Sequence, residues 1–562
     1  MGAFEKDPFV PGMIVACWSC CMFDLMVRNG HVVDGTGSPW FKADLGIEDG
    51  KIVRVGSLGS AGADKIIDAT GLVVSPGFID IHSHSDFELL ANPKAESKVR
   101  DGVTLEVNGN CGISAAPLKG GNLQRAQGTM HALGLELDWN TFGGYLGRLE
   151  RQGIAMNIAS HVGHTTVRLA VMDYDDRLPT KDELEEMKSH VAKAMEEGAL
   201  GLSSGLEFLP GRSSNTEELM ELCKVVAEYG GIYVTHKRQR DFQGIEALKE
   251  AIEIGRQAGV PVHISHLSLR YPMHGSWREQ LAILESARKE GLDVTADMLT
   301  PAPSIYGWHT GPGFFVAQFI PSWLLDGGVE KALERLRDPE IRAKIKREMK
   351  PQWKFVADGM WDMIWLSKSK NSKHLVGKSF AEIAKITGKS PWDAALDIAL
   401  DEGEDFVNLG VRGASETEDD IINILHSPLC SMGSDGALHA PYGALKEYAF
   451  PDVNSYGTFS RFFRVYVREE RRFTLEEAVR KVTSIAAARL GIMDRGLLRP
   501  GMWADITVFD FDRISDKATF DDPMQYSKGI EYVLVNGETV IAREEHTGAL
   551  PGKVIRSHRP SS

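Results

Sequence analysis

The feature that most constrains the fold is an alternation of strand-like and helix-like segments from about residue 77 to residue 490. Short apolar runs, typical of buried strands, are separated by longer segments with apolar residues at helical spacing. Helices are predicted at 181–197, 215–229, 244–258 and 277–290. Strands are predicted at 78–83, 102–107, 154–160, 199–203, 231–235, 261–265, 292–296 and 429–434. Eight strands with helical crossovers predict an α/β fold, a (β/α)8 TIM-type barrel rather than an open sheet.

Both ends of the chain are rich in short strands instead, and each end has too few strands to form a stable unit alone. We therefore expect one small β-sandwich built from both termini. The gap between the seventh and eighth strands is too long for one crossover and predicts an insertion at about 306–403, aromatic enough for a lid or a packed subdomain over the barrel mouth. The predicted units are a poorly structured extension (1–22), the N-terminal portion of the β-sandwich (23–76), the barrel (77–490), the C-terminal portion of the β-sandwich (491–550) and a C-terminal tail (551–562).

Composition limits the classes of partner. The net charge of the 562 residues is −15, which argues against non-specific binding to nucleic acid and fits a soluble enzyme with a small-molecule substrate. No apolar run reaches the roughly 18 residues that span a bilayer. The apolar stretch 14–18 follows Glu5, Lys6 and Asp7 without a basic excess, so it makes a poor signal peptide, and we expect a cytoplasmic protein without a membrane partner. A homo-oligomer is compatible with the sequence.

Ligand-type side chains gather where the predicted strands end. His82 and His84 close the first strand, and alternation along a strand places both on one side. Two such imidazoles make an open grip for a metal such as Zn²⁺. Later strand ends supply further candidate ligands, Cys111, His236, His266 and Asp435. Because a barrel carries its active site at the carboxyl ends of its strands, the set predicts a metal site there.

Several motifs carry a resemblance to a known family. They lie at 76–84, 110–112, 198–206, 236–238, 264–267, 434–436, 455–459, 499–509 and 533–537. With these motifs the sequence resembles the amidohydrolase superfamily and, within it, the N-acyl-D-amino-acid deacylases (D-aminoacylases), from about residue 23 to residue 545. The resemblance implies the same architecture: a barrel, a split β-sandwich and an insertion before the eighth strand.

The resemblance also implies roles for the candidate ligands. Cys111, His236 and His266 would hold one tightly bound zinc ion, with the cysteine as thiolate. His82 and His84, with Asp435, would form a second, weaker or optional metal position. Asp435 would act as the general base and then as the acid in metal-dependent hydrolysis of an N-acyl bond, a carbon–nitrogen bond other than a peptide bond.

The sequence differs from the family at the positions that bind the substrate's α-carboxylate. The family places a Lys, a Tyr and an Arg at positions that hold Ser268, Leu299 and Asn454 here. All three residues are neutral. The sequence therefore keeps the catalytic residues of the family without its usual carboxylate clamp.

Two explanations stay open for this departure. Another cation near the strand ends, Arg238, Arg270 or Lys237, has taken over the carboxylate, with help from Ser304. Alternatively, the substrate is a neutral or bulky amide, carbamate or ester without that carboxylate. His439, four residues beyond Asp435, is a further candidate for contact with the substrate.

The sequence is therefore compatible with three functions. The family default is deacylation of N-acyl-D-amino acids, and the alternative is hydrolysis of a compound lacking the free carboxylate. A metal-free scaffold relative is a remote third, because such a descendant is expected to lose the ligand residues that this chain has kept.

Overall fold

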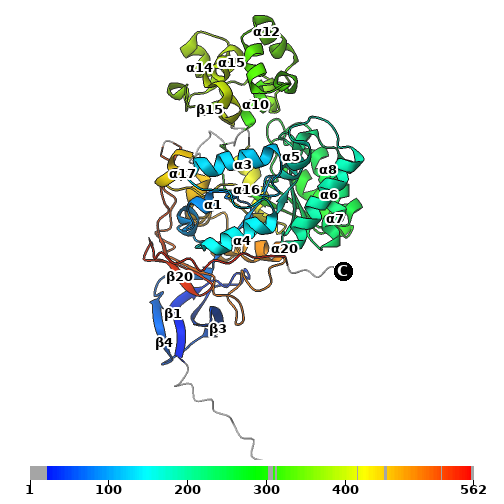
Figure 1. The fold of residues 1–562 in the computed structure, drawn as a ribbon. Helices are drawn as coiled ribbons and strands as arrows, with labels where there is room; N and C mark the ends of the chain where they lie inside the picture. Colours follow the sequence, from blue (N-terminus) through cyan, green and yellow to red (C-terminus); the bar gives the residue numbers. More distant parts are fainter. Residues whose placement is uncertain are drawn as a thin grey trace, which may run out of the picture.

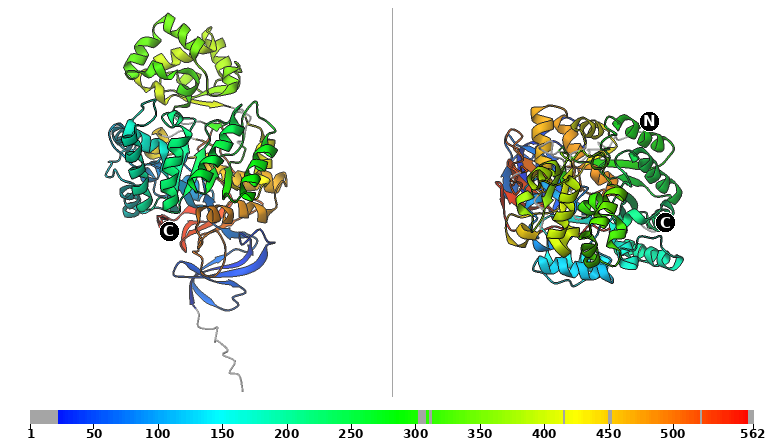
Figure 2. Two further views of the ribbon diagram at one scale, coloured as in Figure 1. Left: turned by 90° about the vertical axis from the view of Figure 1, so that its right-hand side faces the viewer. Right: turned by 90° about the horizontal axis from the view of Figure 1, so that it is seen from above.

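The computed structural model describes residues 22–301, 308–309, 313–413, 416–448, 452–520 and 522–557. The predicted N-terminal extension lies outside the described residues apart from Met22, which already begins the first strand. The end of the predicted C-terminal tail, 558–562, lies outside them as well. Figures 1 and 2 show three tiers, with terminal strands at one end, a body of strands and helices in the middle and a helical unit at the other end.

Parallel strands form the middle tier, and one of them overlaps each of the eight predicted ranges. They are β6 (Phe78–Asp80), β7 (Val103–Asn108), β8 (Asn157–Ser160), β10 (Gly201–Gly205), β11 (Ile232–His236), β12 (Val262–Ile264), β13 (Val294–Met298) and β17 (Cys430–Met432). β6, β7 and β8 pair in that order in one sheet. The second sheet runs β9 (Val162–Gly163), β10, β11, β12, β13 and β17, again with parallel pairing. The fold is mixed α/β.

Backbone contacts link these two sheets at both ends. β9 begins two residues after β8 ends, so one stretch of chain serves both sheets. At the other end, Ser83 forms a parallel bridge with Gly436, and the amide of Asp435 donates to the carbonyl of His82 at 2.8 Å. The segments that follow β6 and β17 therefore lie side by side.

Helices follow the strands of this tier at the predicted positions. α6 (Lys181–Glu196), α7 (Thr216–Glu228), α8 (Gly244–Ala258) and α9 (Trp277–Lys289) agree with the predicted ranges within two residues. A capping box between Thr180 and Glu183 starts α6, and an apolar stripe that includes Met187 and Val191 is buried. The remaining helices of the tier are α1 (Glu88–Ala91), α2 (Glu96–Val99), α3 (Gly121–Ala132), α4 (Phe142–Gln152), α5 (His164–Met172), α16 (Glu418–His426), α17 (Gly443–Tyr448), α18 (Asn454–Arg461), α19 (Leu475–Lys481) and α20 (Ser484–Leu490).

The two terminal segments share one nine-stranded sheet. Its strands are β1 (Met22–Val32), β2 (Phe41–Glu48), β3 (Lys51–Gly56), β4 (Gly62–Asp68), β5 (Val73–Pro76), β18 (Ile506–Phe509), β19 (Ile530–Val535), β20 (Glu538–Ala542) and β21 (Glu545–His546). Antiparallel pairing of β5 with β18 joins the two ends of the chain. Asp49 and Gly50 form the hairpin turn that connects β2 to β3, and both residues have the positive φ (49° and 74°) of a type I′ turn.

The predicted insertion packs around a hydrophobic cluster of its own. Phe315, Phe319, Phe380 and Phe406 are fully buried in that cluster. The unit contains α10 (Phe314–Phe319), α11 (Val329–Leu336), α12 (Pro339–Glu348), α13 (Lys354–Ala357), α14 (Phe380–Thr387), α15 (Pro391–Glu402) and a sheet ordered β14 (Trp308–His309), β16 (Gly410–Gly413), β15 (Ile364–Lys368). β16 pairs with both other strands of this sheet and lies beyond residue 403, the predicted bound of the insertion. None of the helices among the described residues is long and apolar enough to cross a membrane.

Phe78 connects the parallel strands to the terminal sheet. Its ring is fully buried and lies 5.2 Å from the ring of Phe463, 5.8 Å from that of Phe459 and 6.1 Å from that of Phe509 in β18.

Replacing Phe78 by Ala removes these contacts and leaves a cavity, so we expect a loss of about 3–5 kcal/mol in the free energy of unfolding. Urea denaturation followed by tryptophan fluorescence measures the loss. Phe242→Ala is the matched control: that ring is half exposed, and a change within about 0.5 kcal/mol is expected. Equal effects of the two variants would contradict this role for Phe78.

Candidate metal centre

Cys111, His236 and His266 converge from three different strand ends. The Cys111 Sγ lies 3.7 Å from His236 Nδ1 and 3.6 Å from His266 Nε2, and all three side chains are buried. A tetrahedral zinc ion with ordinary Zn–S and Zn–N bond lengths separates its sulfur and nitrogen ligands by about 3.5 Å. The three donor atoms are therefore spaced as zinc requires.

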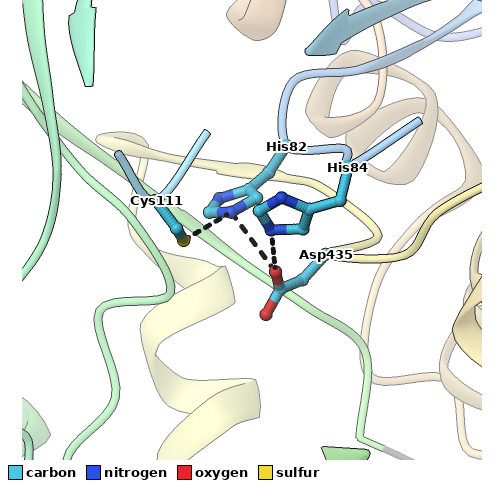
Figure 3. Close-up of side chains that lie close together, drawn as sticks. All are labelled: His82, His84, Cys111 and Asp435. Atoms are coloured by element: carbon cyan, nitrogen blue, oxygen red, sulfur yellow. Dashed lines mark hydrogen bonds and ion pairs between the residues drawn. The ribbon is translucent and has the colours of Figure 1, made fainter. Parts of the chain in front are cut away.

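His82, His84 and Asp435 form a second group that shares Cys111 with the first (Figure 3). His82 Nε2 lies 3.3 Å from the Cys111 Sγ and 3.3 Å from Asp435 Oδ1, and His84 Nε2 lies 2.9 Å from the same oxygen. His82 is fully buried, whereas the side chains of His84 and Asp435 are 27% and 29% exposed. The centre thus has a buried floor and an open side at His84 and Asp435.

Buried carboxylates hold the imidazoles in orientation. Glu207 accepts a hydrogen bond from His236 Nε2 at 2.7 Å and so holds the ring with Nδ1 facing Cys111. Asp297 lies 3.1 Å from His82 Nδ1 and accepts from the backbone amide of His266 at 2.7 Å. A carboxylate behind a ligating histidine is the arrangement that metal sites use to fix ring orientation.

Three residues of the centre have strained backbone conformations. Cys111, His266 and Asp435 have φ of 49°, 32° and 51°, in the left-handed region that side-chain-bearing residues seldom adopt. Such strain persists where the surroundings impose it, most often at functional sites. Gly205 contributes by its lack of a side chain, since a Cβ there would lie 2.0 Å from the Cys111 carbonyl oxygen. The fold therefore forces these three side chains into the centre.

Neighbouring side chains in the centre favour the ionised forms of Cys111 and Asp435. Burial alone would raise the pKa of the Cys111 thiol, but the charge of His82 and hydrogen bonds from His236 and His266 bring it well below its ordinary value. Enclosure likewise raises the pKa of Asp435, and the neighbouring His82 and His84 outweigh it, so that this pKa is also held well below its usual range. Burial, and then the charges of Arg240 and His236, lower the pKa of His266 to about 4, which keeps this imidazole neutral at pH 7.

The predicted substrate-binding residues are placed in different ways. Arg238 is bound to Glu250 of α8, with its Nε 3.0 Å from a carboxylate oxygen, outside both donor groups. Arg270 donates to Glu207 at 3.0 Å and so lies directly behind His236. His439 is buried, with Nδ1 2.8 Å from the hydroxyl of Tyr456. Ser304 lies outside the described residues.

The positions of the family's carboxylate clamp, Ser268, Leu299 and Asn454, are all buried. The structure adds charged residues that the sequence reasoning did not name. Glu207 follows β10 by two residues, so applying the strand-end rule to the fourth strand would have found it. Arg240 and Glu416 meet beside Ser268 through contacts between distant segments of the chain, for which the sequence has no local signal.

Comparison with known proteins identifies the class. A family model described as "Amidohydrolase family" matches residues 65–347 and 426–541, and the chain belongs to this family. Over 534 residues it is 33% identical to the D-aminoacylase of Alcaligenes xylosoxydans xylosoxydans, with 95% of this chain and 97% of that protein covered. The resemblance to D-aminoacylases seen in the motifs is confirmed, and the protein is a hydrolase that acts on carbon–nitrogen bonds other than peptide bonds.

Two solved structures resemble this one along nearly the whole chain. The N-acyl-D-glutamate deacylase of Bordetella bronchiseptica, complexed with zinc and a phosphonate inhibitor, has a TM-score of 0.78 at 31% identity. A D-aminoacylase described by its binuclear metal centre has a TM-score of 0.77 at 32% identity. Each match covers 95% of this chain and 100% of the relative.

The depressed pKa of Cys111 has a measurable consequence. In metal-free protein the thiolate should persist well below the pH at which an ordinary cysteine is protonated, because its folded-state pKa is lowered. Ultraviolet thiolate absorbance, recorded against pH and subtracted from that of Cys111→Ser, isolates this group. Burial raises the pKa of Cys223, so Cys223→Ser should leave the absorbance below pH 7 unchanged. A difference spectrum that appears only above pH 8 would contradict the assignment.

Proposed function

We propose that this protein is a zinc-dependent amidohydrolase that cleaves an N-acyl amide bond. The observation that carries the proposal is the spacing of Cys111 Sγ from His236 Nδ1 and His266 Nε2, 3.7 and 3.6 Å, in a buried site. The relatives support it, since those named above are a D-aminoacylase and a deacylase of N-acyl-D-glutamate, the latter complexed with zinc.

Cys111, His236 and His266 would hold the tight zinc ion, one thiolate and two neutral imidazoles. Three protein ligands leave an open coordination position, as a catalytic site requires. Zinc bound there would activate a water molecule and polarise the acyl carbonyl. His82, His84 and Asp435 would supply an optional second metal position, and the related binuclear D-aminoacylase supports its presence.

Asp435 would move the proton. Its carboxylate is ionised at neutral pH and lies on the open side of the centre, where a substrate can approach. It accepts a proton from the attacking water and then delivers it to the departing nitrogen, because an unprotonated amine anion is a very poor leaving group. His82 and His84 hydrogen-bond to Asp435 and hold it in place for both transfers.

We further propose that the eight parallel strands close into one (β/α)8 barrel and that the terminal strands fold over their own core as a sandwich. The Ser83–Gly436 bridge and the continuity of β8 with β9 support the closure. With this closure, the barrel would extend from residue 77 to residue 490 and would contain the insertion. In such a barrel the proposed ligands lie at the carboxyl edge, the usual place of catalysis.

Two substitutions separate metal binding from proton transfer. We expect Asp435→Asn to keep the tight zinc ion and to lose about 10²–10⁴-fold in kcat, because it cannot accept the proton. Cys111→Ala should lose both the metal and the activity. The assay measures hydrolysis of N-acetyl-D-amino acids and their amides by zinc-loaded protein, with metal content determined by mass spectrometry.

Cys223→Ala is the matched control, since Cys223 is a buried core residue in α7. It should keep both metal and activity. Full activity in Asp435→Asn would contradict its role in proton transfer, and a full zinc complement in Cys111→Ala would contradict the ligand set.

A further inference from the structure

A carboxylate of the chain itself is bound beside the metal centre. The guanidinium of Arg240 donates to Glu416, and the hydroxyl of Ser268 donates to the same Glu416 oxygen at 3.0 Å. Arg240 also donates to the Ser268 hydroxyl at 3.3 Å and to the Ser268 carbonyl at 3.4 Å. The side chains of Arg240 and Glu416 are only 7% and 4% exposed. We call these three residues the Glu416 seat.

The Glu416 seat adjoins the proposed zinc ligands. Ser268 follows His266 by two residues, Arg240 follows His236 by four, and both Arg240 and Glu416 hydrogen-bond to Ser268. Glu416 comes from the segment between β16, the last strand of the insertion, and α16. This segment, through which the chain leaves the insertion, therefore places the Glu416 carboxylate beside Arg240 and Ser268.

An N-acyl amino acid presents a free α-carboxylate, which is bound best by a guanidinium together with a hydroxyl donor. Arg240 and Ser268 are such a pair, and Glu416 already occupies them. A substrate carboxylate would have to displace a tethered one, whose effective concentration is high. It would also separate the buried Glu416 charge from Arg240 and Ser268, which is strongly unfavourable.

The neighbouring cations are engaged elsewhere. Arg238 is paired with Glu250, and Arg270 is paired with Glu207 behind His236. Lys237 is buried and donates to the carbonyl of Leu267 at 2.9 Å. Both arginines are thus ion-paired, and the Lys237 amine is buried against a backbone carbonyl rather than exposed to a substrate.

We infer that Glu416 occupies the carboxylate position of the substrate site, so that this enzyme cleaves N-acyl compounds whose amine moiety has no free α-carboxylate. Amides and esters of N-acyl-D-amino acids, and N-acyl derivatives of simple amines, belong to this class. Glu416 is then a specificity-determining residue that excludes the free acids. The inference rests on the proposed function, hydrolysis of an N-acyl bond at the adjacent centre.

The test compares N-acetyl-D-alanine, N-acetyl-D-leucine and N-acetyl-D-phenylalanine with their carboxamides on zinc-loaded enzyme. We expect the wild type to favour the carboxamides by about 100-fold in kcat/KM, because a buried charge mismatch discriminates strongly. Glu416→Ala frees Arg240, and the ratio of free-acid to carboxamide kcat/KM should rise by at least about tenfold, mainly through KM. Adding Arg240→Met to Glu416→Ala should abolish the gain. Glu404→Ala removes an exposed carboxylate that precedes β16 and should leave the ratio unchanged.

A wild type that prefers the free acids would overturn the inference, and so would a ratio that Glu416→Ala does not shift. If the wild type and the variant cleave neither class, the proposed function fails. Calorimetric binding of N-acetyl-D-leucine then decides the role of Glu416: tighter binding to Glu416→Ala supports it, and equal binding overturns it. Glu416→Gln, which keeps the size and removes the charge, replaces Glu416→Ala in both measurements if the smaller residue prevents folding.

Discussion

The contact between the Cys111 sulfur and three imidazoles is the interaction around which the rest of the site is built. A thiolate is strongly destabilised in a buried place unless cations or a metal ion surround it. The fold meets this requirement with the charge of His82 and with hydrogen bonds from His236 and His266, whose nitrogens lie 3.3–3.7 Å from the sulfur together with that of His82. A metal ion bound to the thiolate would add to this stabilisation, so metal binding and local structure would be coupled.

The supports of this cluster extend outward in a connected series. Glu207 accepts a hydrogen bond from His236 and forms an ion pair with Arg270. The Arg270 guanidinium in turn lies 5.7 Å from the ring centroid of Trp353 in the insertion. Phe208 makes a second link, with its ring 4.6 Å from that of His236 and 4.8 Å from that of Phe314. The insertion is thus packed on Arg270 and Phe208, which lie behind His236 of the proposed metal centre.

Periodicity and the strand-end rule were enough to predict the elements that position the centre. Each parallel strand is a short apolar run bounded by polar residues, and residues at the ends of such strands must share one edge, so His236, His266 and Asp435 could be grouped before any coordinates. Cys111 follows the second strand and joined the same group, whereas its assignment to the tight zinc ion came from the resemblance. β16 was not predicted, because it is four residues long and pairs with strands of the insertion itself.

Substrate preference depends on contacts that are long-range in sequence. Arg238 and Arg270 were reasonable candidates for a carboxylate clamp, but their partners, Glu250 and Glu207, are fixed by packing between elements. Arg240 and Glu416 are 176 residues apart and meet only because the chain leaves and re-enters the body through the insertion. A motif preserves the reaction of a family more readily than its specificity, because chemistry needs a few fixed atoms and specificity depends on whatever charges surround them.

The most direct test of the central claim is zinc K-edge X-ray absorption on protein loaded with one equivalent of zinc. The account predicts a first shell with one sulfur at about 2.3 Å and imidazole nitrogens at about 2.0 Å, and loss of the sulfur contribution in Cys111→Ser. A first shell of nitrogen and oxygen alone in the wild-type protein would contradict it.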